Sequence, residues 1–178
     1  MPNINLGVCG GISAYKTAYL ASELTKNGYS VKTVMTRGAR KFITPLTFET
    51  LTGQRVYTDL FKKPYDENHT SLTAWADFAV IAPATATTMA RMANGLADTL
   101  LSAVILDFKG PVLLCPAMHD AMYDNPATKR NLSLLREYGF HFSGPVSGDL
   151  AGGKRGPGRM EEPEKIFQDI KQIIEPGR

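Results

Sequence analysis

The sequence predicts one α/β domain with a mostly parallel sheet and helices on both faces. Apolar runs typical of buried strands alternate with segments of helical periodicity along the 178 residues. Several of these runs break at a glycine or a proline into a small-residue turn that opens a helix. Strands that alternate with helices favour parallel pairing, and a chain of this length suits a single domain.

Short apolar runs mark the strands in the first half of the chain, and capping residues mark its helices. A first strand covers residues 4–9, and alanine and leucine at helical spacing predict a helix from residue 13 to 26. Thr44 and Pro45 provide a cap and a proline at the first helical position, so a helix follows them to Leu51. The other expected elements are a strand at 31–35, an extended piece at 55–59, a loop at 62–68, helical turns at 70–76 and a buried strand at 77–82.

The second half of the chain continues this alternation. Helices at 86–93 and 97–108 are parted by a turn at Asn94 and Gly95, and Asn125 with Pro126 starts a further helix that ends near residue 138. The segment 146–159 holds five glycines and a proline, which predicts a loop. The remaining elements are strands at 111–115 and 140–142, an amphipathic helix at 162–174 and a tail at 175–178.

Composition and charge exclude several classes of protein. The hydrophobic content of 43% and the charged content of 21% are ordinary for a globular domain, and the apolar runs are shorter than a membrane helix. The N-terminus carries no secretory signal, so we expect a cytoplasmic protein. A net charge of +3 with scattered basic residues argues against nucleic acid as a partner. Cys9 and Cys115 lie in apolar runs and are expected to be buried thiols. Two cysteines alone do not make a zinc site and the histidines are not at ligand spacing, so we expect no metal.

Turns between a strand and a helix are candidates for a ligand site, because open α/β sheets bind ligands at the carboxyl ends of their strands. The turn from Gly10 to Ser13 offers backbone N–H groups and a hydroxyl to a phosphate. It matches neither the dinucleotide fingerprint nor the P-loop, so a plain turn is an equal alternative. Thr85, Thr87 and Thr88 bring three hydroxyls to a second turn, which exceeds what capping a helix requires.

The three histidines differ in their positions along the chain. His119 lies in the turn after a buried strand, which is the strongest of the three positions for chemistry. His69 closes a polar loop just before a helix, and His141 lies in a short apolar segment that suits a structural role. The glycine-rich segment 146–159 suits either a plain connection or a lid that excludes water from a reacting centre.

Taken together, these segments resemble the flavin mononucleotide (FMN)-dependent cysteine decarboxylases over almost the whole chain. This family includes phosphopantothenoylcysteine decarboxylase and the epidermin-type peptidyl-cysteine decarboxylases. The segments similar to family motifs are Gly10–Ser13, Pro83–Thr88, Pro116–Tyr123, Leu150–Met160, and His69 ahead of Ala74-Trp-Ala-Asp77. Those that look like the coenzyme A branch are Thr36-Arg37, Phe42, Thr44-Pro-Leu-Thr-Phe48 and Val56-Tyr-Thr-Asp59.

The resemblance implies a single Rossmann-like (flavodoxin-like) domain over residues 1–174, with residues 146–159 as a substrate flap and FMN as the cofactor. It also implies a homotrimer or homododecamer. The residues that it implies for FMN binding are Gly10, Gly11, Ile12, Ser13, Thr36, Phe42, Pro83, Ala84, Thr85, Thr87, Thr88, Cys115, Ala117 and Met118. Catalysis is assigned by the resemblance to His69 and His119, and substrate binding to His119, Met122, Gly152, Arg159 and Met160.

Three positions depart from the family pattern. Thr87 stands where the flavin motif often has asparagine, and His119 stands where a second motif usually has the asparagine that binds the substrate carboxylate. Gly152 stands where the coenzyme A branch often has a flap cysteine that helps to reduce the intermediate. Without that thiol, we expect some oxidised enethiol to escape from the site.

The function that the resemblance implies is FMN-dependent decarboxylation of a cysteine carboxylate. In that chemistry flavin takes a hydride from the Cβ–S unit, and the resulting C=S group lets carbon dioxide leave. Similarity over the whole chain favours phosphopantothenoylcysteine, the coenzyme A precursor, as substrate. The glycine at position 152 keeps open an oxidative decarboxylase of cysteine-terminated peptides that yields an aminoenethiol. A flavin-binding paralogue that acts as a subunit or regulator is a third reading, and His69 with the flap disfavours a flavin prenyltransferase.

Overall fold

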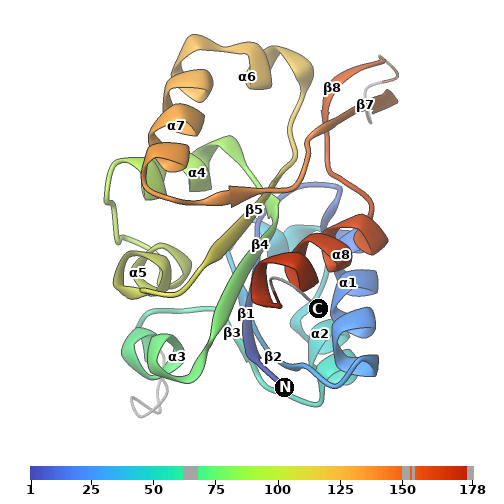
Figure 1. Ribbon diagram of the computed structural model, residues 1–178, viewed down its shortest axis with the longest axis vertical. Helices are drawn as coiled ribbons and strands as arrows, with labels where there is room; N and C mark the ends of the chain where they lie inside the picture. Colours follow the sequence, from blue (N-terminus) through green and yellow to red (C-terminus); the bar gives the residue numbers. More distant parts are fainter. Residues whose placement is uncertain (62–67, 150–152, 154, 176–178) are drawn as a thin grey trace.

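A six-stranded parallel sheet forms the centre of the molecule (Figure 1). The computed structural model describes residues 1–61, 68–149, 153 and 155–175 of the chain. The strand order is β3-β2-β1-β4-β5-β6, which is the Rossmann order and confirms the expected fold class. The strands are β1 (Asn3–Val8), β2 (Ser30–Met35), β3 (Val56–Tyr57), β4 (Phe78–Ala84), β5 (Val112–Pro116) and β6 (His141–Phe142).

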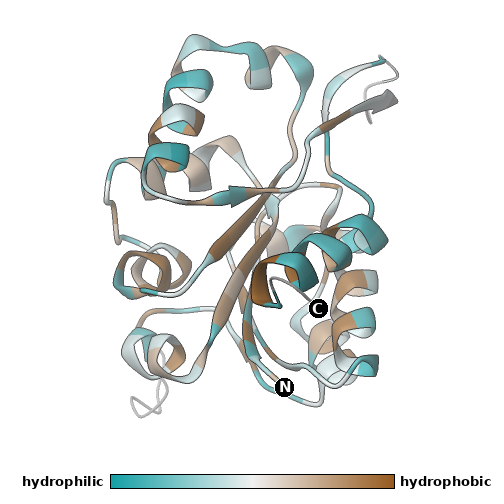
Figure 2. Ribbon diagram, viewed as in Figure 1, coloured by the Kyte–Doolittle hydropathy of each residue, from teal (hydrophilic) through white to brown (hydrophobic). Residues whose placement is uncertain are grey.

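Helices cover both faces of this sheet, and a separate apolar cluster lies beneath each layer. One cluster joins α1, α2 and α8 to the sheet through residues such as Leu20, Phe48 and Ile166. The other joins α3, α4, α5 and α7 to the opposite face through residues such as Leu72 and Met89. Figure 2 shows the hydrophobic colour gathered along the central strands. The helices are α1 (Ala14–Lys26), α2 (Pro45–Thr52), α3 (His69–Trp75), α4 (Ala86–Ala93), α5 (Leu100–Asp107), α7 (Pro126–Glu137) and α8 (Pro163–Ile174), with short turns at η1 (Ala39–Lys41) and α6 (Asp120–Asp124).

Side-chain caps set several of the helix starts. Asn125 accepts a hydrogen bond from the amide of Ala127 at the start of α7, as the Asn-Pro pair predicts. Helix α5 starts at Leu100, three residues later than expected, because Thr99 and Ser102 form a reciprocal capping box there. The described residues include no helix that is long and apolar enough to cross a membrane.

The glycine-rich segment differs most from expectation. Instead of a plain loop it forms two antiparallel strands, β7 (Val146–Asp149) and β8 (Arg155–Arg159), which we call the arm. Ladder hydrogen bonds between these strands satisfy backbone groups that a loop would leave to water. In Figure 1 the arm extends beyond the sheet near α6, a one-turn helix that the sequence did not predict.

Candidate functional site

The carboxyl ends of β1 and β4 mark the point where the sheet reverses its winding. The chain leaves β1 towards β2 on one side and leaves β4 towards β5 on the other. Ligands of open α/β sheets bind at this kind of switch point. A cavity of about 970 Å³ opens there, within the usual range for a small-molecule site. The predicted residues that line it are Gly10, Gly11, Ile12, Ser13, Thr36, Thr85, Thr87, Thr88, Ala117, Met118, His119, Met122 and Arg159.

The turn after β1 lies tightly against the turn after β2. A Cβ atom on Gly10 would lie 2.8 Å from the backbone carbonyl carbon of Gly38, so only glycine fits at this position. Thr36 stabilises the second turn, because its Oγ1 accepts a hydrogen bond of 3.2 Å from the amide of Ala39. Helix α1 begins directly after Ser13, whose side chain makes no capping hydrogen bond. The unpaired N–H groups of a helix start in such a cradle suit a phosphate or another anion.

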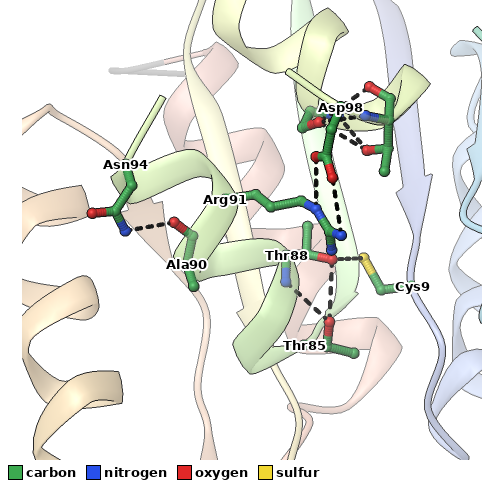
Figure 3. A network of polar contacts seen from close by, with 9 residues as sticks. Cys9, Thr85, Thr88, Ala90, Arg91, Asn94 and Asp98 are labelled. Carbon is green, nitrogen blue, oxygen red and sulfur yellow. Dashed lines mark hydrogen bonds and ion pairs between the residues drawn. The ribbon is translucent and has the colours of Figure 1, made fainter. Parts of the chain in front are cut away.

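The turn after β4 uses two of its three threonines internally (Figure 3). Thr85 caps α4 and accepts a hydrogen bond of 3.3 Å from the amide of Thr88. The two hydroxyls of Thr85 and Thr88 are 3.1 Å apart, and the thiol of Cys9 donates to Thr88 Oγ1 at 3.2 Å. Thr87 is exposed and lines the cavity. Thr87 is therefore the threonine with a hydroxyl left for a ligand.

Both cysteines are buried and unbonded to each other, as expected. Burial raises the pKa of the Cys9 thiol to about 11, and it also raises the pKa of Cys115. Both groups therefore stay protonated at neutral pH, and neither is a nucleophile. Cys9 supports the threonine turn through its hydrogen bond to Thr88, and Cys115 lies within β5.

The cavity carries positive charge. Lys16, Arg37, Arg91 and Arg159 line it together with His119, and the described lining residues include no carboxylate. Arg37 is exposed, next to the glycine turn that contacts Gly10. Such a concentration of cations favours anionic ligands.

Carboxylates just outside the cavity hold three of these cations. Arg91 pairs with Asp98 through two hydrogen bonds of 2.8 and 3.2 Å, as drawn in Figure 3. Glu162 accepts hydrogen bonds from Lys16 at 2.8 Å and from Arg159 at 2.7 Å. The hydrogen bond from Lys16 is the main reason that the pKa of Glu162 lies below its ordinary value. These pairs fix the cations in place without cancelling the excess of positive charge.

The arm and the turn after β5 form one wall of the cavity. The amide of Met118 donates a hydrogen bond of 2.9 Å to the carbonyl of Gly158 in β8. The next residue, His119, directly precedes α6 without a side-chain capping hydrogen bond, and its Nδ1 lies 2.6 Å from Asp120 Oδ1. His119 and Arg159 therefore meet at the same cavity from two different segments.

The other predicted site residues do not line the cavity. Pro83 and Ala84 belong to β4, Cys115 and Met160 are fully buried, and Phe42 is exposed after η1. His69 starts α3 and is half-buried away from the cavity lining. Gly152 lies outside the described residues, as do residues 176–178 of the tail.

Sequence reasoning missed several residues that line the cavity, Lys16, Gly38, Arg91 and Gly158 among them. Lys16 carried a usable signal, because it lies in the first turn of a helix that begins at a candidate phosphate turn. Arg91 carried none, since a basic residue on a helix is ordinarily a solvated one. Gly158 was one of many glycines in its segment.

The chain is similar to known proteins along most of its length. A family profile described as Flavoprotein matches residues 1–175. The coenzyme A biosynthesis bifunctional protein CoaBC of Bacillus subtilis (strain 168) is 46% identical over 168 residues. That match covers 93% of this chain, and the chain spans 41% of the length of that relative.

Two solved structures share the fold. A mutant of PPC decarboxylase complexed with pantothenoylaminoethenethiol is 32% identical, with a TM-score of 0.86 and 98% of each chain covered. The FMN-dependent cysteine decarboxylase SpaF is 33% identical, with a TM-score of 0.85. The likeness covers 98% of this chain and 95% of SpaF.

Proposed function

The chain belongs to the flavoprotein family, and we propose that it uses FMN to decarboxylate phosphopantothenoylcysteine. The observation that carries this proposal is the cationic cavity at the switch point between β1 and β4, closed on one side by His119 and the arm. The likeness to CoaBC and to PPC decarboxylase supports the choice of substrate. The substrate carries a phosphate and a carboxylate, and the excess of cations in the cavity suits both groups.

The residues present fit FMN. The close approach of Gly10 to Gly38 leaves a cradle of backbone amides from Gly10 to Ser13, which would hold the phosphate. Thr87 and Met118 would contact the rest of the cofactor from the turns after β4 and β5. When bound, FMN supplies an acceptor for the hydride that leaves the cysteinyl Cβ, so that a C=S group can take up electrons as carbon dioxide departs.

The chain's own residues bind and orient the substrate in this proposal. As an imidazolium, His119 donates from Nε2 to the substrate carboxylate, while its Nδ1, 2.6 Å from Asp120 Oδ1, donates to the Asp120 carboxylate. Arg159 adds a guanidinium to the anionic substrate from the arm. The arm also covers the cavity beside His119 and limits the access of water to the departing carboxylate.

We propose that His69 acts in the site of a neighbouring copy within a homotrimer or homododecamer. An exposed apolar patch supports such an assembly: Ile12, Tyr15 and Tyr19 lie on and just before α1, and exposed Leu46 lies on α2, which packs against α1. Ile12 and Tyr15 also line the cavity, so the patch and the cavity are continuous. Large exposed apolar patches mark protein interfaces, and a second copy on this patch would reach the site.

Replacing Gly10 by alanine is expected to abolish FMN binding. The added Cβ would lie 2.8 Å from the backbone of Gly38, which can move only if the phosphate cradle opens. The flavin absorbance of the purified variant measures the loss. Gly53→Ala is the control for replacing a glycine outside the cradle, because Gly53 does not line the cavity and its Cβ would meet nothing within 4 Å. Equal flavin content in the two variants would contradict this account of the cradle.

Mass spectrometry of the products tests the proposed function. Protein loaded with FMN is mixed separately with phosphopantothenoylcysteine and with a peptide that ends in cysteine. We expect the first substrate to lose carbon dioxide, with some product that has lost two further hydrogens. Turnover of the peptide alone would instead support oxidative decarboxylation of cysteine-terminated peptides, the alternative that the glycine at position 152 keeps open. No turnover of either substrate by the flavin-loaded protein would support a non-catalytic subunit or regulator.

A further inference from the structure

Glu162 lies where the arm joins α8, and it links two cations that line the cavity. Its Oε1 accepts hydrogen bonds from Lys16 Nζ at 2.8 Å and from a terminal nitrogen of Arg159 at 2.7 Å. Glu162 itself does not line the cavity. One carboxylate oxygen therefore connects α1, the arm and the start of α8 just behind the cavity wall.

Lys16 is the fixed end of this link. Its side chain is only 7% exposed, and its ammonium also donates to the carbonyl of Met160 at 3.3 Å. A buried ammonium keeps its partners because an unpaired charge in the interior is costly. Glu162 is thereby tied to the first helix, and the N-terminal end of α8 favours its negative charge.

Arg159 is the adjustable end of the link. Its side chain is 38% exposed and lines the cavity, and a long flexible side chain there could adopt several rotamers. A charge-assisted hydrogen bond to a fixed carboxylate selects one of them. An arginine has five N–H donors, so the bond to Glu162 leaves others for a ligand.

We propose that Glu162 is a positioning residue that holds the Arg159 guanidinium at the cavity wall, where it binds an oxyanion of the substrate. This inference rests on the proposed decarboxylase and adds to it a residue that acts through another. The same link steadies the wall beside His119, because Arg159 follows Gly158, whose carbonyl holds the amide of Met118.

A double-mutant cycle tests the proposal. Glu162→Gln, Arg159→Gln and the double variant are compared in the FMN-loaded protein with phosphopantothenoylcysteine as substrate. We expect Glu162→Gln to raise KM by about tenfold with little change in kcat, as for the loss of one charge-assisted contact. In the Arg159→Gln background the same change should add less than about twofold, because the residue that it positions is already gone.

A matched control separates positioning from general destabilisation. Asp124→Asn removes an exposed ion pair of 3.1 Å with Lys129, and neither residue lines the cavity. This variant should keep the wild-type KM. Repeating the KM measurements with the substrate that lacks its phosphate shows which oxyanion Arg159 binds. If the effect of Glu162→Gln disappears, the oxyanion is the phosphate, and if it persists, it is the carboxylate.

Hydrogen exchange supplies a measurement that needs no turnover. The amide of Met118 should exchange faster in Glu162→Gln than in the wild type or in Asp124→Asn, because its acceptor in the arm is loosened. Losses of kcat/KM that multiply in the double variant would overturn the proposal, as would unchanged Met118 exchange in Glu162→Gln. If Met118 exchanges faster in Glu162→Gln as expected, but the wild-type protein turns over neither substrate, the proposed function is contradicted. The structural link through Glu162 would still stand.

Discussion

His119→Ala is expected to abolish decarboxylation and to leave FMN bound. His119 lines the cavity at the start of α6, and the cradle from Gly10 to Ser13 lies at the end of a different strand. Loss of a single group that stabilises charge in a reaction typically costs about 10²–10³ in kcat. Product formation under saturating substrate measures the loss, and flavin absorbance shows that the cofactor stays.

Two further variants make this prediction specific. The family motif that Pro116–Tyr123 resembles usually has asparagine where this sequence has His119, so we expect His119→Asn to retain much of the activity that alanine loses. His141→Ala is the matched control, because that side chain is exposed on the edge strand β6 and does not line the cavity. Turnover by His119→Ala close to that of the wild type would contradict a role for this residue in binding the carboxylate.

Gly158→Ala is expected to displace the arm from the cavity wall. Gly158 has a φ of +125°, and an added Cβ would lie 2.3 Å from the carbonyl oxygen of Met118. That oxygen belongs to the backbone, so the contact is relieved only if β8 moves away from the segment that carries His119. Overpacking of this kind costs about 1–3 kcal/mol, and the conformation of the residue adds strain of about 1–2 kcal/mol.

Gly158→Ala should lower the activity of the protein more than its global stability. The arm packs at the edge of the molecule, and the two apolar clusters under the helices do not include its strands. We therefore expect kcat/KM for phosphopantothenoylcysteine to fall by about 10²-fold, the scale set by the displacement of a positioned group. The midpoint of thermal unfolding should change much less.

Gly153→Ala is the control for backbone strain alone. Gly153 has a φ of +79°, but an added Cβ would meet nothing within 4 Å. An equal loss of activity in both variants would show that flexibility of the segment matters, rather than the close approach to Met118. A wild-type kcat/KM in Gly158→Ala would contradict the role given to the arm.

Local signals in the sequence predicted most of the fold. The pair Asn125-Pro126 starts α7 because capping and the fixed φ of proline act within a few residues. The spacing of apolar residues predicted α8 for the same reason, since one face must be buried. The arm was missed because its glycines carry no side chains to alternate between two faces, so its pairing left no periodic signal.

The candidate site was predicted in part. The turns that begin at Gly10 and Thr85 were found because a strand that ends in small residues before a helix is a local pattern. His119 was found from its place in the turn after a buried strand, the resemblance to a family added Arg159, and both line the cavity. His69 comes from that resemblance as well, but it lies outside the cavity lining of a single chain.

By itself, the sequence determined which segments become strands, helices and ligand-binding turns, because periodicity and capping are properties of neighbouring residues. Only the tertiary structure decided that the turns after β1 and β4 meet in one cavity, since that depends on the order of strands in the sheet. It also decided that Lys16 and Glu162, 146 residues apart in the chain, share a hydrogen bond behind that cavity. Folding partly removes these two charges from water and places them side by side, although they are far apart in the sequence. No local sequence pattern shows which charges will form such a pair.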